Sequence, residues 1–329
     1  MKIRKLYHLP PDKQQDLNYL IRLEWWNLAF RISIVLILAL VLGNSQAMKV
    51  AWLEDMLSLI PPIAFLLAVR YRKRPPNETY PYGYQRATII AFLCTATALS
   101  AMGLFLLGDS LLKLVQQEHP SIGAITLFGE TIWMGWLMVG VLIYSVIPPV
   151  IIGHLQTKAA AKVHEKTVFA DGKMSKADWM TGLAAIVGVL GVGAGFWWAD
   201  AAAAAVIALD VTKDGITNLK EAVGDLLDRR PHFTSREKPE HMEEALEAEL
   251  CAMSWVAAAS VRLREEGPIF SGEAFVTPHN NDDLARHLQE ASQHLNSYDW
   301  RIYEVVVTAW PREEQSTSPT LSKSPGEND

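Results

Sequence analysis

Apolar residues fall into long runs, separated by short polar loops, between residues 25 and 222. A helix needs about 20 predominantly apolar residues to cross the hydrocarbon core of a bilayer. Six runs reach this length, and they cover residues 25–43, 48–69, 87–111, 127–153, 168–193 and 196–217. The second, fifth and sixth runs also contain charged residues. The pattern predicts a domain of six transmembrane helices over residues 25–222.

Basic residues are distributed unevenly among the loops that join these runs. Lys and Arg gather in "VRYRKRPP", in "QTKAAAKVHEK" and after the last run, whereas "GNSQAM", "QQEHPSIGAIT" and "GAGFWWA" contain none. Because cytoplasmic loops are enriched in Lys and Arg, the alternation places both termini in the cytoplasm. We therefore expect a cytosolic N-terminal segment over residues 1–24 and a multi-pass protein of a bacterial inner (plasma) membrane.

The C-terminal region is more polar and alternates between helical and strand patterns. The successive elements are a helix, two strands, a helix and a strand, over residues 237–253, 255–267, 268–278, 281–296 and 299–310. This order predicts a small cytosolic α+β domain over residues 223–311, of the αββαβ, ferredoxin-like type. The tail over residues 312–329 is rich in Pro, Ser and charged residues, so we expect it to be disordered.

Composition narrows the functional classes. The net charge of −6 argues against a nucleic-acid partner. The two cysteines, Cys94 and Cys251, support neither a disulfide framework nor a Cys-based metal cluster. Since no constellation of a nucleophile with a base is recognisable, we expect a membrane-embedded protein that is not an enzyme and holds no cofactor.

Three stretches of the chain have counterparts in one family of transporters. They are "RPPNETYPYGYQRA" after the second run, "FADGKMSKADW" at the start of the fifth and "LKEAVGDLLDRRP" at the end of the sixth. Together with the six runs and the αββαβ pattern, they make the chain resemble the cation diffusion facilitator family. The resemblance implies a secondary transporter that exports a divalent cation in exchange for protons and functions as a homodimer.

The resemblance also implies where the transported ion binds. The family forms a tetrahedral site from two residue pairs, each with i,i+4 spacing, in the second and fifth spans. Carried over position by position, one pair falls on Glu54 and Ser58 and the other on Met174 and Asp178. Met174 stands where the family has a histidine, so this chain is a divergent member.

Two further carboxylates are candidates for the same site. A shift of one residue would exchange Glu54 for Asp55, and Asp171 lies nearer the cytoplasmic mouth of the fifth span. Residues four apart share a helix face, so Met174 and Asp178 point the same way. Two carboxylates at one depth in a membrane repel each other unless a cation or a proton lies between them.

Each assigned residue also has a structural alternative. Asp178 can pair with a buried cation such as Arg31 of the first run. Glu54 can mark the outer water interface, Met174 can be an ordinary packing residue, and Ser58 can bond back to its own helix. In the sixth run we expect Lys213 to form a structural ion pair with Asp210 or Asp214; the alternative is that these residues belong to a proton path.

The ligand types favour some cations over others. Two carboxylates, a hydroxyl and a thioether lack the imidazole that suits Zn²⁺, so we expect Mn²⁺ or Fe²⁺ rather than Zn²⁺. A second zinc site of the family falls on Asn77, Tyr80 and Tyr84, and we expect it to be absent. Two other functions stay open: Na⁺/H⁺-type exchange, and a non-transporting partner or regulatory subunit of another transporter.

Overall fold

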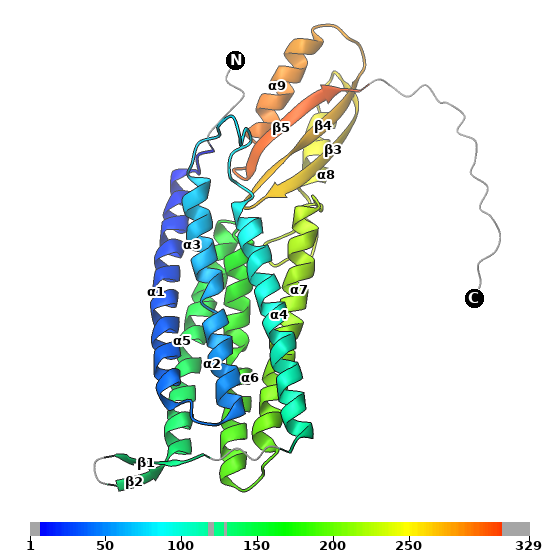
Figure 1. The fold of residues 1–329 in the computed structure, drawn as a ribbon. Helices are drawn as coiled ribbons and strands as arrows, with labels where there is room; N and C mark the ends of the chain where they lie inside the picture. Colours follow the sequence, from blue (N-terminus) through cyan, green and yellow to red (C-terminus); the bar gives the residue numbers. More distant parts are fainter. Residues whose placement is uncertain (1–6, 118–121, 128–129, 311–329) are drawn as a thin grey trace, which may run out of the picture. The chain divides into compact units, whose positions relative to one another are not determined.

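The computed structural model describes residues 7–117, 122–127 and 130–310 (Figure 1). The tail expected to be disordered, residues 312–329, lies outside the described residues. The chain folds into two compact units: the first is Met1–Glu240 with Arg264–Ser271, and the second is His241–Leu263 with Gly272–Asp329.

Long helices packed side by side make up the first unit (Figure 1). They are α1 (Pro11–Val41), α2 (Gln46–Leu57), α3 (Ile60–Arg72), α4 (Ala87–Val115), α5 (Met134–Lys162), α6 (Lys166–Gly193) and α7 (Ala199–Leu226). Four segments are long and apolar enough to cross a membrane: α1, α2 together with α3, α4, and α5. Helices α6 and α7 each contain 28 residues and pack against the others.

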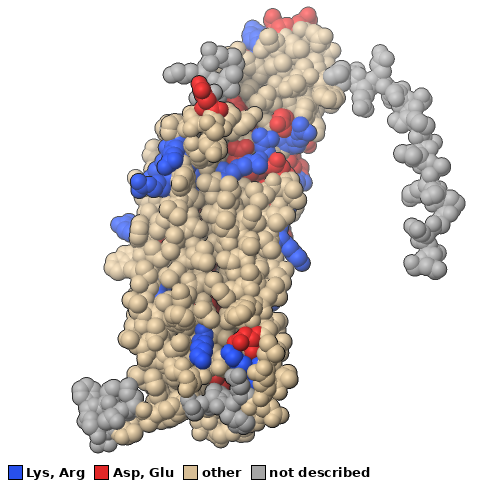
Figure 2. Space-filling view, in the orientation of Figure 1, with Lys and Arg blue, Asp and Glu red and all other residues tan. Residues whose placement is uncertain are grey.

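The outer surface of these helices is largely apolar. Leu36, Phe105, Ile143 and Val187, on four different helices, all have exposed side chains. On the face shown in Figure 2, the middle of the helical unit carries few charged side chains. An apolar exterior of this extent suits contact with lipid.

The fourth predicted span starts later than the apolar pattern indicates. Strands β1 (Ala124–Leu127) and β2 (Glu130–Trp133) pair antiparallel, with Ala124 opposite Trp133. Helix α5 therefore begins at Met134 rather than at residue 127, and it continues to Lys162. A short apolar run fits a buried strand as well as a helix, so the pattern alone placed this boundary wrongly.

The second predicted span is divided by a break at Ser58 and Leu59. Pro61 and Pro62 occupy the first turn of α3, where a missing N–H is tolerated. Because neither proline can donate a hydrogen bond, the carbonyl groups of Leu57 and Ser58 lack their regular helical donors four residues ahead. The break between α2 and α3 therefore leaves these two carbonyl oxygens without the hydrogen bonds of a regular helix, in the middle of a predicted membrane span.

Helices α4 and α7 approach each other closely at two glycines. A Cβ atom on Gly103 would lie 2.8 Å from Cα of Thr212, and one on Gly215 would lie 2.6 Å from the backbone nitrogen of Ser100. Larger residues at either position would force the backbones apart. The glycines thus allow close backbone contact and fix the position of α7 along α4.

Asp200 of α7 is fully buried and caps the start of α2. Its Oδ1 accepts hydrogen bonds from Ser45 Oγ (2.6 Å) and Ala47 N (3.1 Å), and its Oδ2 accepts one from Gln46 N. Ser45 Oγ in turn accepts a bond from Met48 N (3.1 Å). One carboxylate therefore satisfies donors that the helix itself leaves without partners.

We expect Asp200→Asn to lower the melting temperature of the detergent-solubilised chain. The new amide NH₂ would face donors instead of accepting from them, and an unsatisfied buried group costs about 1–3 kcal/mol. Thermal unfolding followed by circular dichroism measures the effect. Asp12→Asn, at an exposed position in the first turn of α1, is the control and should melt like the wild type. Equal melting temperatures for both variants would rule out the capping role.

The second unit contains a small sheet with two helices. Its elements are α8 (Met242–Cys251), β3 (Val256–Glu266), β4 (Ile269–Pro278), α9 (Leu284–Asn296) and β5 (Ile302–Ala309), with strand order β3-β4-β5. Leu246, Leu250, Val276, Leu295 and Val305 are fully buried in it. The order helix, strand, strand, helix, strand agrees with the sequence pattern.

The turn between β3 and β4 belongs to the first unit. Lys166 Nζ, at the start of α6, donates to both carboxylate oxygens of Glu265 (2.5 and 2.6 Å), and His232 N donates to Glu265 Oε1 (2.8 Å). The ring of Phe270 packs edge-on against His164, with 5.2 Å between the ring centroids. The first unit thus includes a piece of chain from within the C-terminal sequence.

Candidate functional site

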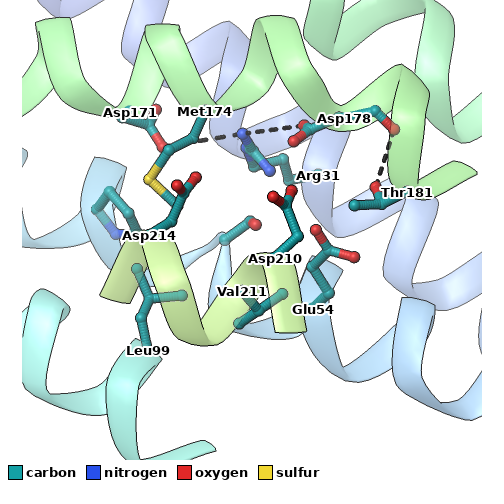
Figure 3. A pocket seen from close by; sticks show the side chains of 12 residues that line it. Arg31, Glu54, Leu99, Asp171, Met174, Asp178, Thr181, Asp210, Val211 and Asp214 are labelled. Carbon is teal, nitrogen blue, oxygen red and sulfur yellow. Dashed lines mark hydrogen bonds and ion pairs between the residues drawn. The ribbon is translucent and has the colours of Figure 1, made fainter. Parts of the chain in front are cut away.

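One cavity gathers acidic side chains from several helices of the first unit (Figure 3). Its volume is about 20 Å³. That room suits a single ion or a few waters rather than an organic molecule. The acidic residues in its lining are Glu54, Asp171, Asp178, Asp210 and Asp214.

All four residues assigned to an ion site from the sequence line this cavity. Glu54 lies on α2 and Ser58 at its C-terminal end, while Met174 and Asp178 lie one turn apart on α6. Asp171, one turn before Met174, lines it too. The fold therefore brings together two residue pairs that lie far apart in the sequence.

Asp55, the alternative to Glu54, lines a neighbouring cavity of about 20 Å³. Glu54, Ser58 and Asp178 border this second cavity as well. Both span-two carboxylates thus lie beside Asp178, and both remain candidate ligands. The break after α2 adds the Ser58 carbonyl as an oxygen that no regular helical bond occupies.

Two carboxylates of α7 are additional members of the site. Asp210 and Asp214 line the main cavity, one helical turn apart. Lys213, which was expected to pair with one of them, is exposed, whereas both carboxylates line the cavity; the ion pair stays a prediction. Their i,i+4 spacing, the same as in the two assigned pairs, was the signal in the sequence that pointed to this role.

Arg31 of α1 enters the cavity between two acidic residues (Figure 3). Its Nη2 lies 3.8 Å from Asp171 Oδ1 and 3.9 Å from Asp178 Oδ2. The Arg31 side chain is 2% exposed and that of Asp171 5%, whereas Asp178 retains 24% exposure. The structural alternative for Asp178 is therefore present: a buried arginine pairs with it.

A second group of polar side chains continues from Asp171 toward the start of α1. Asp171 Oδ2 accepts hydrogen bonds from Gln156 Nε2 (2.9 Å) and Asn27 Nδ2 (3.3 Å). The same Gln156 Nε2 donates to Glu24 Oε1 (2.7 Å). Glu24, Asn27 and Gln156 are all buried, so one amide group links two buried carboxylates.

Among the described residues, no three His, Cys, Asp or Glu side chains are close enough together to hold a metal ion. The carboxylates of the cavity are arranged around the Arg31 guanidinium instead. An ion bound here by several carboxylates would require Arg31 and its neighbours to rearrange.

The loop between α3 and α4 is organised by contacts among its own residues. Asn77 Nδ2 donates to the hydroxyl of Tyr84 (2.9 Å), and Tyr80 N donates to Asn77 Oδ1 (2.7 Å). The rings of Tyr80 and Tyr84 lie 4.8 Å apart. These residues therefore shape the loop.

Sequence comparisons relate the chain to transport proteins. Residues 27–227 match the cation efflux transmembrane domain, which is more than half of the chain. The manganese efflux system protein MneS of Bacillus subtilis is 26% identical over 190 residues, which cover 57% of this chain and 60% of that protein. MneP, a manganese efflux system protein of the same organism, is 24% identical over 195 residues, 57% of this chain and 61% of its own length.

The cation-efflux pump FieF of Shewanella oneidensis is 22% identical over 225 residues, which cover 65% of this chain and 71% of the pump. The alignment with MneS thus spans about three fifths of that relative's length.

Proposed function

This chain belongs to the cation efflux family, and from that premise we propose that it exports a divalent metal cation, of the Mn²⁺ or Fe²⁺ type rather than Zn²⁺, from the cytoplasm in exchange for protons. A membrane transporter of this kind is not an enzyme. The observation that carries the proposal is the convergence of carboxylates from α2, α6 and α7 on one small cavity among membrane helices.

The donor set supports the choice of cation. The cavity offers carboxylates, the Ser58 hydroxyl and the Met174 thioether, and its lining contains neither His nor Cys. Oxygen ligands suit Mn²⁺, a thioether also accommodates Fe²⁺, and imidazole or thiolate would favour Zn²⁺. Two of the similar proteins, MneS and MneP, are described as manganese efflux proteins.

The proposed transport cycle is an exchange of ligands. Glu54 or Asp55 and Asp178, with Asp171 nearby, bind either the metal cation or protons, and a movement of the helices opens the site to one side of the membrane at a time. Six spans are part of this proposal, formed by α1, α2 with α3, and α4 to α7. We also propose cytoplasmic termini, a cytosolic second unit, a homodimer and location in a bacterial inner membrane.

One observation favours a second candidate function. Arg31 pairs with Asp178 and Asp171, which the proposed cation would have to contact. A chain whose site is held permanently by an arginine would act as a non-transporting partner of another transporter.

Flux measurements on the purified chain alone decide between these functions. In proteoliposomes with an imposed proton gradient, we expect uptake of Mn²⁺ to be accompanied by proton movement and to be faster than uptake of Zn²⁺. The proposed export is refuted if no divalent cation drives proton movement faster than in protein-free liposomes. Zinc faster than manganese would refute the choice of cation.

A histidine at position 174 should change the metal preference. Met174 Sδ lies in the cavity and accepts a hydrogen bond from Asn218 Nδ2 (3.3 Å). We expect Met174→His to tighten Zn²⁺ binding by about tenfold, equivalent to about 1.4 kcal/mol, because an imidazole is a better zinc ligand than a thioether. Titration of the purified chain measures this change. Met180→His, at an exposed position of the same helix, should leave zinc binding unaltered; equal gains in both variants would show that the cavity is not involved.

A further inference from the structure

The buried Arg31 guanidinium is anchored on one side only. Its Nε donates to Asn27 Oδ1 (3.2 Å) and its Nη2 to Ser175 Oγ (2.5 Å), and these two bonds hold the planar group in place. Its Nη1 has no hydrogen-bond partner although it is buried. Arg31 thus faces the cavity with donor capacity that its neighbours do not use.

The contacts between Arg31 and the carboxylates are ion pairs without hydrogen bonds. At 3.8 and 3.9 Å, Nη2 is beyond hydrogen-bond distance of both Asp171 and Asp178. Arginine often binds a carboxylate through two parallel hydrogen bonds, and here it does not. The guanidinium therefore neutralises Asp178 by charge alone, through a contact that a stronger ligand can replace.

Asp171 has partners that remain when Arg31 leaves Asp178. Gln156 and Asn27 both donate to it. Glu24, held to the same Gln156 amide, adds a second buried carboxylate on this side. Arg31 consequently lies between two carboxylates that both line the main cavity, Asp178 and Asp171, and Glu24 lies beyond Asp171 toward the start of α1.

We infer that Arg31 is a tethered counter-cation: it neutralises Asp171 and Asp178 while no transported ion is bound, and a divalent cation must displace it from Asp178 in order to bind. The inference rests on the proposed function, and it adds that Arg31 competes with the transported cation for Asp178. Two positive groups cannot both lie within about 4 Å of Asp178 without strong repulsion. Arg31 thereby weakens cation binding and provides the group that replaces the cation when it is released.

Equilibrium binding of Mn²⁺ to the purified full-length chain in detergent tests this inference. We expect Arg31→Gln to bind Mn²⁺ at least about tenfold more tightly than the wild type, which corresponds to about 1.4 kcal/mol. Arg22→Gln, at an exposed position earlier on α1, is the matched control and should bind like the wild type. Arg31→Gln/Asp178→Asn should lose the gain, because the competitor acts through Asp178.

A purely structural arginine gives a different pattern. Arg31→Gln would then bind Mn²⁺ as weakly as the wild type or more weakly while eluting as a folded protein, and that result overturns the inference. If Arg31→Gln does not fold, Arg31→Met decides, because methionine also removes the charge while its apolar chain fills the space of the arginine stem. A changed Mn²⁺ affinity that depends on Asp178 supports the inference, and an unchanged affinity refutes it.

The flux assay separates this inference from the proposed function. If the wild type exchanges Mn²⁺ for H⁺ but Arg31→Gln does not bind Mn²⁺ more tightly, only the role of Arg31 as a competitor is refuted. A gain in affinity without wild-type exchange refutes only the export function, and shows a chain whose arginine keeps the site closed to ions.

Discussion

Asp178→Asn should reduce cation-coupled proton flux in proteoliposomes to the level of protein-free membranes. Asp178 borders both cavities and lies beside Glu54, Asp55 and Ser58. It is also the more accessible partner of Arg31, with 24% of its side chain exposed. An asparagine keeps the shape but removes the charge that attracts a divalent cation and the group that exchanges a proton for it.

A matched substitution controls for the loss of a membrane carboxylate in general. Asp109 on α4 pairs with Lys113, one turn away. This pair is partly exposed and Asp109 does not line either cavity. Asp109→Asn should therefore retain flux. Normal flux in a well-inserted Asp178→Asn protein would refute the assignment of the site.

Glu265→Gln should destabilise the first unit more than any surface substitution. Lys166 and Glu265 have side-chain exposures of 6% and 4%, and the carboxylate holds the ammonium with both oxygens. Removing one partner of a buried ion pair leaves an uncompensated charge and costs about 3–5 kcal/mol. Glu273→Gln, which breaks a more exposed pair with Arg262, should cost at most about 1 kcal/mol. Thermal unfolding of both variants in detergent measures the difference.

The same carboxylate predicts how stability depends on pH. Burial raises the pKa of Glu265, but the nearby His164 ring and the Lys166 charge lower it by more, so that it falls from 4.5 to about 2. A lowered pKa stabilises the folded state above pH 4.5, and this contribution is lost as the pH falls from about 4.5 to about 2. Its full size is about 3 kcal/mol. Wild type should therefore lose more stability than Glu265→Gln between pH 5 and pH 3, and parallel losses would contradict the proposed pairing.

Local patterns predict most of the helices. Apolar runs near the length of a bilayer identify α1, the α2–α3 pair, α4 and α5 as membrane helices. Spacing of four residues places Met174 with Asp178 and Glu54 with Ser58 on common helix faces, and all four residues share one cavity. The membrane helices are predicted correctly because an apolar run depends on residues close together in the sequence. The ion site itself was assigned from the family resemblance and stays a prediction.

The errors concern contacts between distant residues and boundaries of apolar runs. Asp210 lines the cavity, where α2 and α6 supply the neighbouring groups, whereas the sequence alone indicated only Lys213 of its own helix as a partner for Asp210 or Asp214. The partner of Asp200 is a helix start about 155 positions earlier, and no local pattern can indicate it. At residues 124–133 the apolar run was compatible with either a helix or a hairpin, and pairing between strands decided the outcome.

The buried pair of Lys166 and Glu265 also has a consequence for biosynthesis. The two residues are 99 positions apart, and chains are synthesised at about 5–20 residues per second. Lys166 therefore emerges from the ribosome about 5–20 s before the carboxylate that neutralises it. During that interval the start of α6 can remain in contact with water, and this buried ion pair forms only after the β3–β4 turn has been made. A chain that terminates before the β3–β4 turn would keep this lysine without the carboxylate that neutralises it.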